Sequence, residues 1–304
     1  MVKVKELYLI KEPHTFLGVS GDPAKTRISI VGVPFDSTNS FRPGSRFAPS
    51  RIRIASQSLE TYSLRAGISI DENPPVDEGD VFTVHGSAEA TLRNLSSVAQ
   101  ELLSEGRVPI YLGGDHIITY GIVEGVLRSL GVKPCALIFD AHLDFRREYL
   151  GYRWSHACVT RRVLELLGPE KVMVIGVRAI DKEELKDAKT LGLKYLTILD
   201  IERSTLRTVS SKVKEHIAGC DALHISIDMD VLDPAYAPGV STPEPEGVNT
   251  EWLLNILRNI VSEEVVSIDI TEVNPLVDVG DITSFLAARV AVEAAAYLKA
   301  SGIK

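Results

Sequence analysis

Three side chains of metal-binding type occupy every second position of the segment Asp140-Ala141-His142-Leu143-Asp144. The apolar run Cys135–Phe139 directly precedes them and predicts a short buried strand. In extended backbone, alternate side chains point to the same side, so these three can converge at the end of the strand if the backbone stays extended. Two carboxylates and an imidazole this close together need a positive charge to neutralise them. A metal ion is the simplest candidate.

Similar polar residues follow three other predicted strands. A Gly-Gly-Asp-His segment ends at His116, an Asp-Met-Asp segment begins at Asp228, and Glu272 follows a strand that contains Asp269. Ligands of open α/β sheets bind beyond the carboxyl ends of the strands, so these positions predict one common site. The candidate metal ligands are His116, Asp140, His142, Asp144, Asp228 and Asp230.

The charge of this set favours two metal ions over one. Its four carboxylates carry about four negative charges near neutral pH. Two divalent cations would cancel these charges, whereas one would leave an excess that a pocket at the strand ends tolerates poorly. Oxygen-rich ligation with two imidazoles and no thiolate favours Mn²⁺ over Zn²⁺. Such a metal pair lowers the pKa of a bridging water and supplies hydroxide as a nucleophile.

Each motif also has a structural interpretation when it is taken alone. An Asp-x-Asp pair is common in turns, and Asp115 could simply cap the helix that follows it. The combination of all motifs at the strand ends of one chain favours the metal site. Cys158 beside His156 suggests a thiol nucleophile, but no Asn or Asp orienting group is apparent. We expect the remaining histidines to be structural or exposed: His14, His85, His216 and His224.

Short β-type runs alternate with helical patterns, which predicts a parallel sheet buried on both faces. The predicted strands are Arg27–Val33, Val108–Leu112, Cys135–Phe139, Lys171–Val177, Lys194–Leu199, Ala222–Ile227 and Val265–Ile270. The predicted helices are Ala90–Glu105, Ile117–Leu130, Cys158–Leu167, a helix N-capped by Asp181 and running through Thr190, a helix N-capped by Thr250 and running through Val261, and Thr283–Ala300. We expect one α/β domain over residues 1–304 with seven or eight strands, and the pattern alone also allows a closed barrel.

Composition restricts the class of protein. Hydrophobic residues make up 45% and charged residues 24% of the 304 residues, as expected for a globular core. The net charge of -8 argues against a nucleic-acid partner. The chain shows no signal-peptide pattern and no run long enough to span a membrane. Cys135, Cys158 and Cys220 are scattered, so we expect reduced thiols in a cytoplasmic protein without a disulfide.

Four segments together resemble the motifs of the ureohydrolases, the arginase/agmatinase family of dimanganese amidinohydrolases. They are Gly113–His116, Phe139–Asp144, Ser226–Pro234 and Asp269–Pro275. The resemblance begins at Gly32–Asp36 and Arg42–Pro49 and reaches the final helix, so it covers nearly the whole chain.

This resemblance implies a three-layer α/β/α fold with an eight-stranded, mostly parallel sheet and assembly into homotrimers or homohexamers. It also implies two Mn²⁺ per subunit, with His116, Asp140, Asp144 and Asp228 on one ion and Asp140, His142, Asp228 and Asp230 on the other. In the implied chemistry, Glu272 pairs with the guanidinium group of the substrate, Asp144 handles the proton of the nucleophile, and His156 is the acid/base or proton-shuttle residue.

The segment between Asp144 and His156 lacks the α-carboxylate-binding residues of arginases and is closer to agmatinases. The resemblance therefore implies a small cationic guanidino substrate, agmatine, cleaved to putrescine and urea. Asp181 could contact the distal amine or only cap a helix, and Thr242 is a further candidate substrate contact. Ala157 stands where the family more often has Gly.

Several alternatives stay open at this level. Guanidinobutyrate, aminopropylagmatine or formimidoylglutamate could be the substrate, and Arg146 resembles a residue of formimidoylglutamases. We expect Arg146 to form a surface or inter-subunit salt bridge, and Arg42 and Arg46 to form salt bridges that shape the pocket. A single-zinc deacetylase of related fold and a non-catalytic assembly protein are the alternatives from other classes.

Overall fold

The computed structural model describes residues 3–303 and contains one nine-stranded open sheet. In spatial order its strands are β1 (Leu9–Ile10), β5 (Val76–Val81), β2 (Ile28–Gly32), β6 (Val108–Leu112), β11 (Val265–Thr271), β10 (Leu223–Asp228), β7 (Cys135–Phe139), β8 (Val172–Val177) and β9 (Lys194–Thr197). Only the short edge strand β1 runs antiparallel to its neighbour among the strands described in this sheet. Two free edges exclude a closed barrel.

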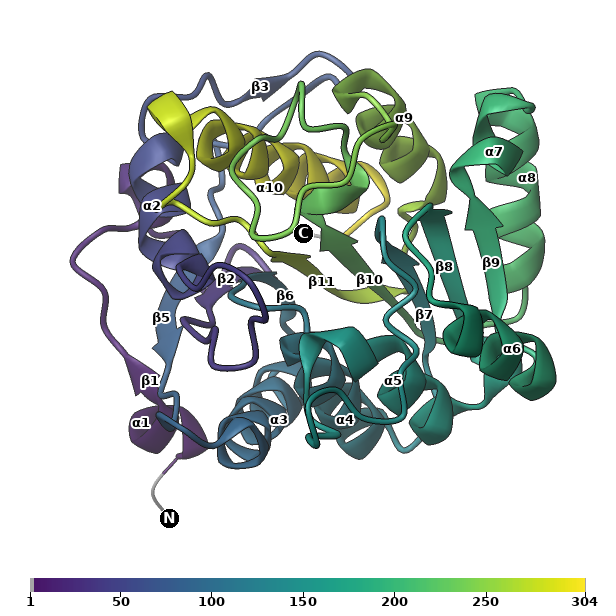
Figure 1. Cartoon of the computed structure of the whole chain (residues 1–304). Coiled ribbons are helices and arrows are strands. Elements are labelled where there is room, and N and C mark those ends of the chain that lie inside the picture. Colours follow the sequence, from purple (N-terminus) through teal and green to yellow (C-terminus); the bar gives the residue numbers. More distant parts are fainter. Residues whose placement is uncertain (1–2, 304) are drawn as a thin grey trace.

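Helices cover both faces of this sheet (Figure 1). One layer contains α2 (Ala48–Ser56), α7 (Ile198–Glu202), α8 (Leu206–Ile217), α9 (Thr250–Ile260) and α10 (Ile282–Ala300). The other contains α1 (Val4–Tyr8), α3 (Ala88–Ser104), α4 (Ile118–Leu130), α5 (Val159–Leu167) and α6 (Lys182–Leu191). A separate two-stranded sheet pairs β3 (Tyr62–Ser63) with β4 (Ile68–Ser69). The expected three-layer α/β/α fold with a mostly parallel sheet is confirmed, but the sheet has nine strands and not the expected eight.

Side-chain alternation along the strands divides the interior into two apolar cores. In β7, Cys135, Leu137 and Phe139 pack into the core under α10, whereas Ala136 and Ile138 pack into the core under α3 and α4. Alternate residues of a strand face opposite sides of the sheet, so a central strand that is buried on both faces needs apolar residues at every position. This explains the unbroken apolar run. No helix in the described part of the chain is long and apolar enough to cross a membrane.

The four central strands are neighbours in the order β6, β11, β10 and β7. They are the strands whose carboxyl ends lead into the polar segments identified in the sequence. Because all four run parallel, these segments meet at one edge of the sheet. The topology therefore brings together side chains that are up to 156 residues apart in sequence.

Two strand predictions need correction. Strand β9 ends at Thr197, not at Leu199, because Thr197 and Asp200 form a capping box that starts α7 at Ile198. Strand β5 was not predicted, since its sequence Val-Asp-Glu-Gly-Asp-Val is acidic and contains a glycine. Helices α2 and α8 were not predicted either. The predicted cap at Asp181 is confirmed as a capping box with Glu184.

The expectation of three reduced cysteines is wrong. Cys135 and Cys220 form a disulfide with their Cα atoms 5.9 Å apart, and Cys158 is the free cysteine of the described chain. The pairing arises because Cys220 lies three residues before β10, and Leu223 of β10 is in register with Cys135 of β7. A separation of 85 residues hides this proximity in the sequence. The cytoplasmic location was expected because the thiols were taken to be reduced, and this argument does not hold for Cys135 and Cys220.

Candidate metal centre and catalytic cavity

His116 reaches the site through a tight turn after β6. A Cβ atom on Gly114 would lie 1.7 Å from the carbonyl oxygen of Phe35, so only glycine permits this close approach. Directly after it, the backbone N–H of Asp115 donates to the same oxygen over 2.7 Å. The turn thereby fixes His116 at the buried edge of the sheet.

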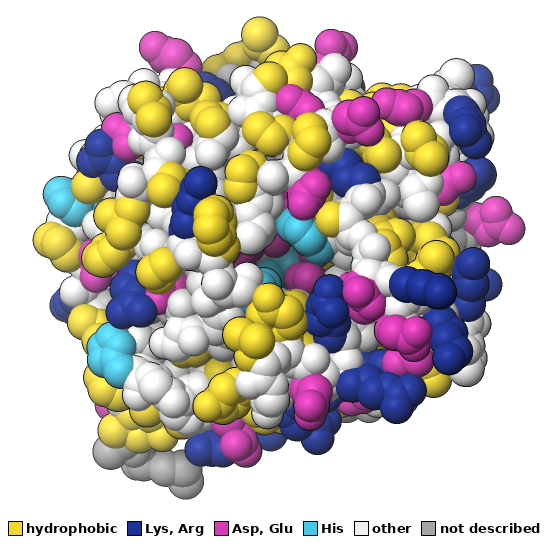
Figure 2. Space-filling model, in the orientation of Figure 1, with side chains coloured by type: hydrophobic (Ala, Val, Ile, Leu, Met, Phe, Trp, Pro, Cys, Tyr) yellow, Lys and Arg dark blue, Asp and Glu magenta, His cyan; other side chains and the backbone are white. Residues whose placement is uncertain are grey.

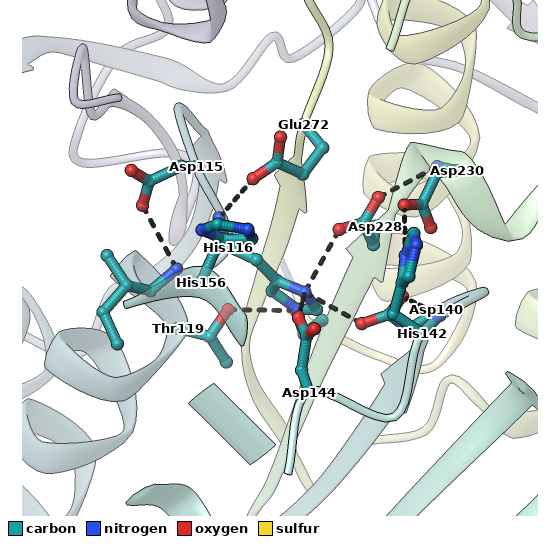
Figure 3. Close-up of polar contacts among 12 residues, drawn as sticks. Asp115, His116, Thr119, Asp140, His142, Asp144, His156, Asp228, Asp230 and Glu272 are labelled. Carbon is teal, nitrogen blue, oxygen red and sulfur yellow. Dashed lines mark hydrogen bonds and ion pairs between the residues drawn. The ribbon is translucent and has the colours of Figure 1, made fainter. Parts of the chain in front are cut away.

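Carboxylates surround the Nδ1 atom of His116 (Figure 3). The distances from Nδ1 are 3.0 Å to Asp140 Oδ2, 3.1 Å to Asp228 Oδ2 and 3.5 Å to Asp144 Oδ2. His116, Asp140 and Asp228 are almost completely buried. These four side chains come from the ends of three different strands.

The opposite side of the imidazole shows which nitrogen carries the proton. His116 Nε2 lies 3.0 Å from Ser226 Oγ, and Ser226 donates its own hydroxyl proton to Asp269 Oδ1 over 2.6 Å. Ser226 must therefore accept from an N–H at Nε2. This assigns a lone pair to Nδ1 in the neutral imidazole, pointing at the carboxylates. Two further donors, Thr119 and His224, hold Asp269 in place.

A second group of ligand-type atoms lies around His142. Its Nδ1 is 2.9 Å from Asp230 Oδ2 and 3.6 Å from Asp140 Oδ1. One oxygen of each neighbouring carboxylate accepts a hydrogen bond from a backbone N–H group. The N–H of His142 donates to Asp140, the N–H of Asp230 donates to Asp228, and the N–H of Ala141 donates to Asp230. The second oxygen of each stays directed into the cluster. Asp140 belongs to both groups and joins them.

This arrangement fits two metal ions that share Asp140. His116 Nδ1 and Asp140 Oδ2 are buried and have no hydrogen-bond partner, although they face each other. Two lone pairs in this position repel unless a cation lies between them. Bonds of about 2.1 Å at right angles to one cation place neighbouring donor atoms about 3 Å apart, which is the observed spacing. The donor set of oxygen and imidazole nitrogen suits Mn²⁺.

The pKa values show the surplus of negative charge. Burial, followed by the charge of Asp140, raises the pKa of Asp144 to about 7. Burial also raises the pKa of Asp228 well above its usual value, and the charges of Asp230 and Asp140 add to this effect. Burial opposes a charge on His116, but the nearby carboxylates of Asp140, Asp144 and Asp228 outweigh it and raise the pKa of the imidazole. A bound cation would relieve the same repulsion.

Two carboxylates of the site lie on strained backbone. Asp144 has a φ of 49° and Glu272 a φ of 62°, a region that residues other than glycine rarely adopt. The backbone after Phe139 therefore does not stay extended to Asp144, as the alternation argument required. His142 is still bridged in parallel register to Ala179, but Asp144 reaches the cluster through a left-handed turn. Glu272 accepts a hydrogen bond from the backbone N–H of His116 over 2.8 Å.

A cavity of about 370 Å³ opens over the cluster. Figure 2 shows it as a hollow near the centre of that face, with histidine and acidic side chains on its floor. His142, Asp144, Asp228, Asp230 and Glu272 reach it from the cluster. His156 lies on its wall, and burial lowers the pKa of its imidazole to about 4. The imidazole of His156 is therefore neutral at ordinary pH.

The predicted substrate contacts Asp181 and Thr242 both line this cavity. Asp181 also caps α6: its Oδ1 accepts from the N–H of Glu183, and it forms a capping box with Glu184. Arg146 also lies on the wall, where Nη2 is 3.5 Å from Glu184 Oε2. Its expected salt bridge therefore lies within the subunit and at the cavity, not at the outer surface.

Other predictions for single residues have mixed outcomes. Arg46 pairs with Asp36 as expected. Arg42 forms no ion pair with a described residue, and its guanidinium stacks on Phe41 at 4.6 Å instead. Burial raises the pKa of Cys158 to about 12, which disfavours a thiolate nucleophile. His14 and His85 are exposed, whereas His224 is fully buried and holds Asp269 behind the metal centre.

Sequence reasoning missed two supporting parts of the site. Arg178 donates to the backbone carbonyls of Asp230, Glu244 and Pro245 and thereby fixes the loop that carries Asp230. The layer behind His116, made by Ser226, Thr119 and Asp269, was also missed. This layer could have been predicted from the buried strand β10, because every second residue of that strand is polar: His224, Ser226 and Asp228.

Comparison with known proteins agrees with this geometry. The model of the arginase family matches residues 26–296. The chain is 34% identical to an agmatinase of Halalkalibacterium halodurans over 267 residues, which cover 87% of this chain and 90% of that protein. It is 32% identical to the mitochondrial guanidino acid hydrolase of Homo sapiens over 283 residues, covering 91% and 80% of the two chains.

Among solved structures, the agmatine ureohydrolase of Thermoplasma volcanium superposes with a TM-score of 0.86 at 34% identity and covers 96% of both chains. Fold and site together define a hydrolase with a cluster of potential metal ligands at the strand ends. The chain belongs to the arginase family, close to the agmatinases.

Proposed function

We propose that this protein is an agmatine ureohydrolase that uses two Mn²⁺ per subunit to form putrescine and urea. The acidic lining of the cavity carries the proposal. Within the described residues 3–303, the lining includes the carboxylates of Asp144, Asp181, Glu184, Asp228, Asp230 and Glu272 and one guanidinium, that of Arg146. Once the metal ions neutralise Asp144, Asp228 and Asp230, the carboxylates of Asp181 and Glu272 remain on the lining, and they favour a dication such as agmatine over arginine, which also carries a carboxylate.

Six residues would hold the two metal ions. His116, Asp140, Asp144 and Asp228 would bind one ion, and Asp140, His142, Asp228 and Asp230 would bind the other. When bound, such a pair supplies hydroxide near neutral pH by lowering the pKa of water. The orphaned Nδ1 of His116 and Oδ2 of Asp140 support this assignment.

The proposed roles of the other groups follow from their positions. Glu272 is held by the N–H of His116 and would pair through its carboxylate with the planar guanidinium of the substrate. Asp144 would accept the proton of the attacking water at Oδ2 and deliver it to the leaving nitrogen. His156, neutral on the cavity wall, would exchange protons with the departing amine at a ring nitrogen. Asp181 and Thr242 would contact the distal part of the substrate.

A substrate panel tests this proposal. Protein loaded with Mn²⁺ should release urea from agmatine well above its rate on arginine. Glu272→Gln should raise KM for agmatine because a charge-assisted contact is lost, whereas the exposed Glu263→Gln should match the unmodified protein. Inertness toward agmatine, guanidinobutyrate and aminopropylagmatine alike would refute the proposal.

Arg146 favours a second candidate function, hydrolysis of a guanidino acid. Its side chain is 37% exposed on the cavity wall, and its guanidinium makes no hydrogen bond to a described residue besides the 3.5 Å ion pair with Glu184. A substrate carboxylate could occupy these free donors. Guanidinobutyrate, and formimidoylglutamate with formamide detection, belong in the panel. Arg146→Met should abolish activity on such acids, with the more exposed Arg147→Met as control, and should leave agmatine hydrolysis intact.

Three further features stay predictions. The chain is proposed to act as one catalytic domain, in homotrimers or homohexamers, and in the cytoplasm. Light scattering of the purified protein tests the assembly. A monomer would contradict it.

A further inference from the structure

The hydroxyl of Thr38 joins three segments at the rim of the cavity. Its Oγ1 donates to Asp115 Oδ2 over 2.9 Å and accepts from the backbone N–H of His156 over 2.9 Å. The backbone N–H of Thr38 donates to the same carboxylate oxygen over 3.0 Å. Because a hydroxyl has one proton, its donation to Asp115 leaves its lone pairs for His156.

Asp115 is a rigid anchor for this contact. It is completely buried directly after β6, and its Oδ1 accepts from the backbone N–H of Ile117 over 3.3 Å. Among the described residues, each hydrogen-bond partner of its side chain is a donor, so the carboxylate acts as an acceptor in all three contacts. Figure 3 shows Asp115 and His156 on the same side of the metal cluster. Asp115 lies in the turn between β6 and α4, Thr38 in a turn after β2, and His156 at the start of a short 3-10 helix.

Hydroxyl groups also surround the ring of His156. Its Nδ1 lies 3.4 Å from Thr38 Oγ1 and 3.4 Å from Ser155 Oγ, and its Nε2 lies 3.4 Å from Ser40 Oγ. Since Thr38 gives its proton to Asp115, it can only accept from a proton on Nδ1. This contact favours a lone pair on Nε2, beside Ser40 at the cavity wall.

We infer that Asp115 and Thr38 are positioning residues for His156. The buried carboxylate orients the Thr38 hydroxyl, and the hydroxyl fixes both the backbone and the ring of His156 against the cavity. This inference rests on the proposed catalytic role of His156. If Thr38 only pinned its own loop, its loss would reduce stability, but its effect on turnover would not depend on His156.

Three variants separate these cases. Thr38→Val removes the hydroxyl at nearly constant shape, and Thr38→Ser keeps it. Thr83→Val is the matched control, because its half-buried hydroxyl contacts the Pro34 carbonyl over 3.5 Å and not His156. Hydrogen exchange of the peptide that contains His156 measures the backbone contact without any need for activity.

We expect the His156 amide to exchange at least about tenfold faster in Thr38→Val and at the unmodified rate in Thr38→Ser and Thr83→Val. The kcat for urea release should fall about 10- to 100-fold in Thr38→Val with KM changed less than about threefold, and Thr38→Ser should restore it. In a His156→Ala background, Thr38→Val should change kcat by less than about twofold.

Unchanged exchange in Thr38→Val would overturn the inference, as would a full loss of kcat that persists in the His156→Ala background. An unmodified protein that hydrolyses no guanidino compound would instead refute the proposed function. The exchange experiment then still decides whether Thr38 holds the His156 segment.

Discussion

Two buried clusters of charged side chains lie in this protein, and they are neutralised in different ways. Between α2 and β5, the fully buried guanidinium of Arg53 donates to both oxygens of Asp77, to Asp80 Oδ1 and to the carbonyl of Gly79. At the carboxyl ends of the central strands, four aspartates and Glu272 surround two imidazoles, and no arginine or lysine of the described chain pairs with the four aspartates.

The difference separates a cluster that stabilises the fold from one arranged for a ligand. The donors of Arg53 and both of its carboxylate partners are satisfied within the chain. Around His116, the buried Nδ1 atom of the imidazole and Oδ2 of Asp140 face each other, and neither has a hydrogen-bond partner. Buried charge is tolerated only when it is paired, so the second cluster requires a cation from outside the chain.

The largest expected effect is on turnover. Asp144→Asn should lower kcat by about 10³-fold because the group that handles the proton is lost. The melting temperature should stay near that of the unmodified protein, because the change removes one of several like charges. Asp221→Asn, an exposed carboxylate, is the control. Activity of Asp144→Asn within a few-fold of the unmodified protein would refute this role.

Arg53→Met should affect stability and not chemistry. Removing this guanidinium leaves the carboxylates of Asp77 and Asp80 without their cationic partner, which costs about 3–5 kcal/mol. Denaturant unfolding measures the loss, and the folded fraction should keep its kcat. The exposed pair of Arg128 and Glu124 gives a matched control, for which Arg128→Met should change stability by less than about 1 kcal/mol. Equal losses in both variants would remove the distinction between the two regions.

Metal binding should stabilise the strand-end cluster. At a concentration of 100 times Kd, one Mn²⁺ site that exists only in the folded state adds about 2.7 kcal/mol to the free energy of unfolding. Thermal unfolding with and without Mn²⁺ measures this gain. Asp228→Asn should abolish most of it, whereas Asp77→Asn should retain it. A gain of the same size in Asp228→Asn would place the bound ions elsewhere.

The smallest expected effect is the pH dependence contributed by His156. Burial depresses its pKa in the folded protein to about 4, below the usual value of 6.5. The unfolded chain therefore binds more protons between these values, so stability is complete above pH 6.5 and decreases as the pH falls toward 4. The loss should be about 1–3 kcal/mol. Denaturant unfolding at pH 7.5 and pH 4.5 should show a smaller loss of the free energy of unfolding in His156→Ala than in the unmodified protein. The same loss in both proteins would contradict this role of His156.

Local pattern was enough to predict the centre of the sheet. Strands Val108–Leu112 and Cys135–Phe139 have the predicted bounds, because strands buried on both faces require apolar residues throughout. Strand β5 was not predicted because its acidic residues have partners far away in the sequence: Asp77 and Asp80 pair with Arg53, which lies on a helix that was also missed, and Glu78 pairs with Lys5. Tertiary pairing of this kind leaves no periodic signal along the chain.

In the candidate site, too, some features follow from local sequence patterns and others depend on tertiary contacts. Strand ends that meet at one edge of a parallel sheet made the convergence of His116, Asp140 and Asp228 predictable. The left-handed turn at Asp144 and the contact of Thr38 with Asp115, 77 residues away, depend on loop conformations that no local pattern encodes. The disulfide between Cys135 and Cys220 likewise depends on strand register.

Metal counting tests the central claim most directly. Apoprotein dialysed against Mn²⁺ and analysed by elemental mass spectrometry should contain two ions per chain, and Asp140→Asn should lose affinity for both because Asp140 belongs to both ligand groups. If the unmodified protein instead bound a single ion per chain, and that ion were zinc, the result would contradict the two-metal site and favour a deacetylase-type centre.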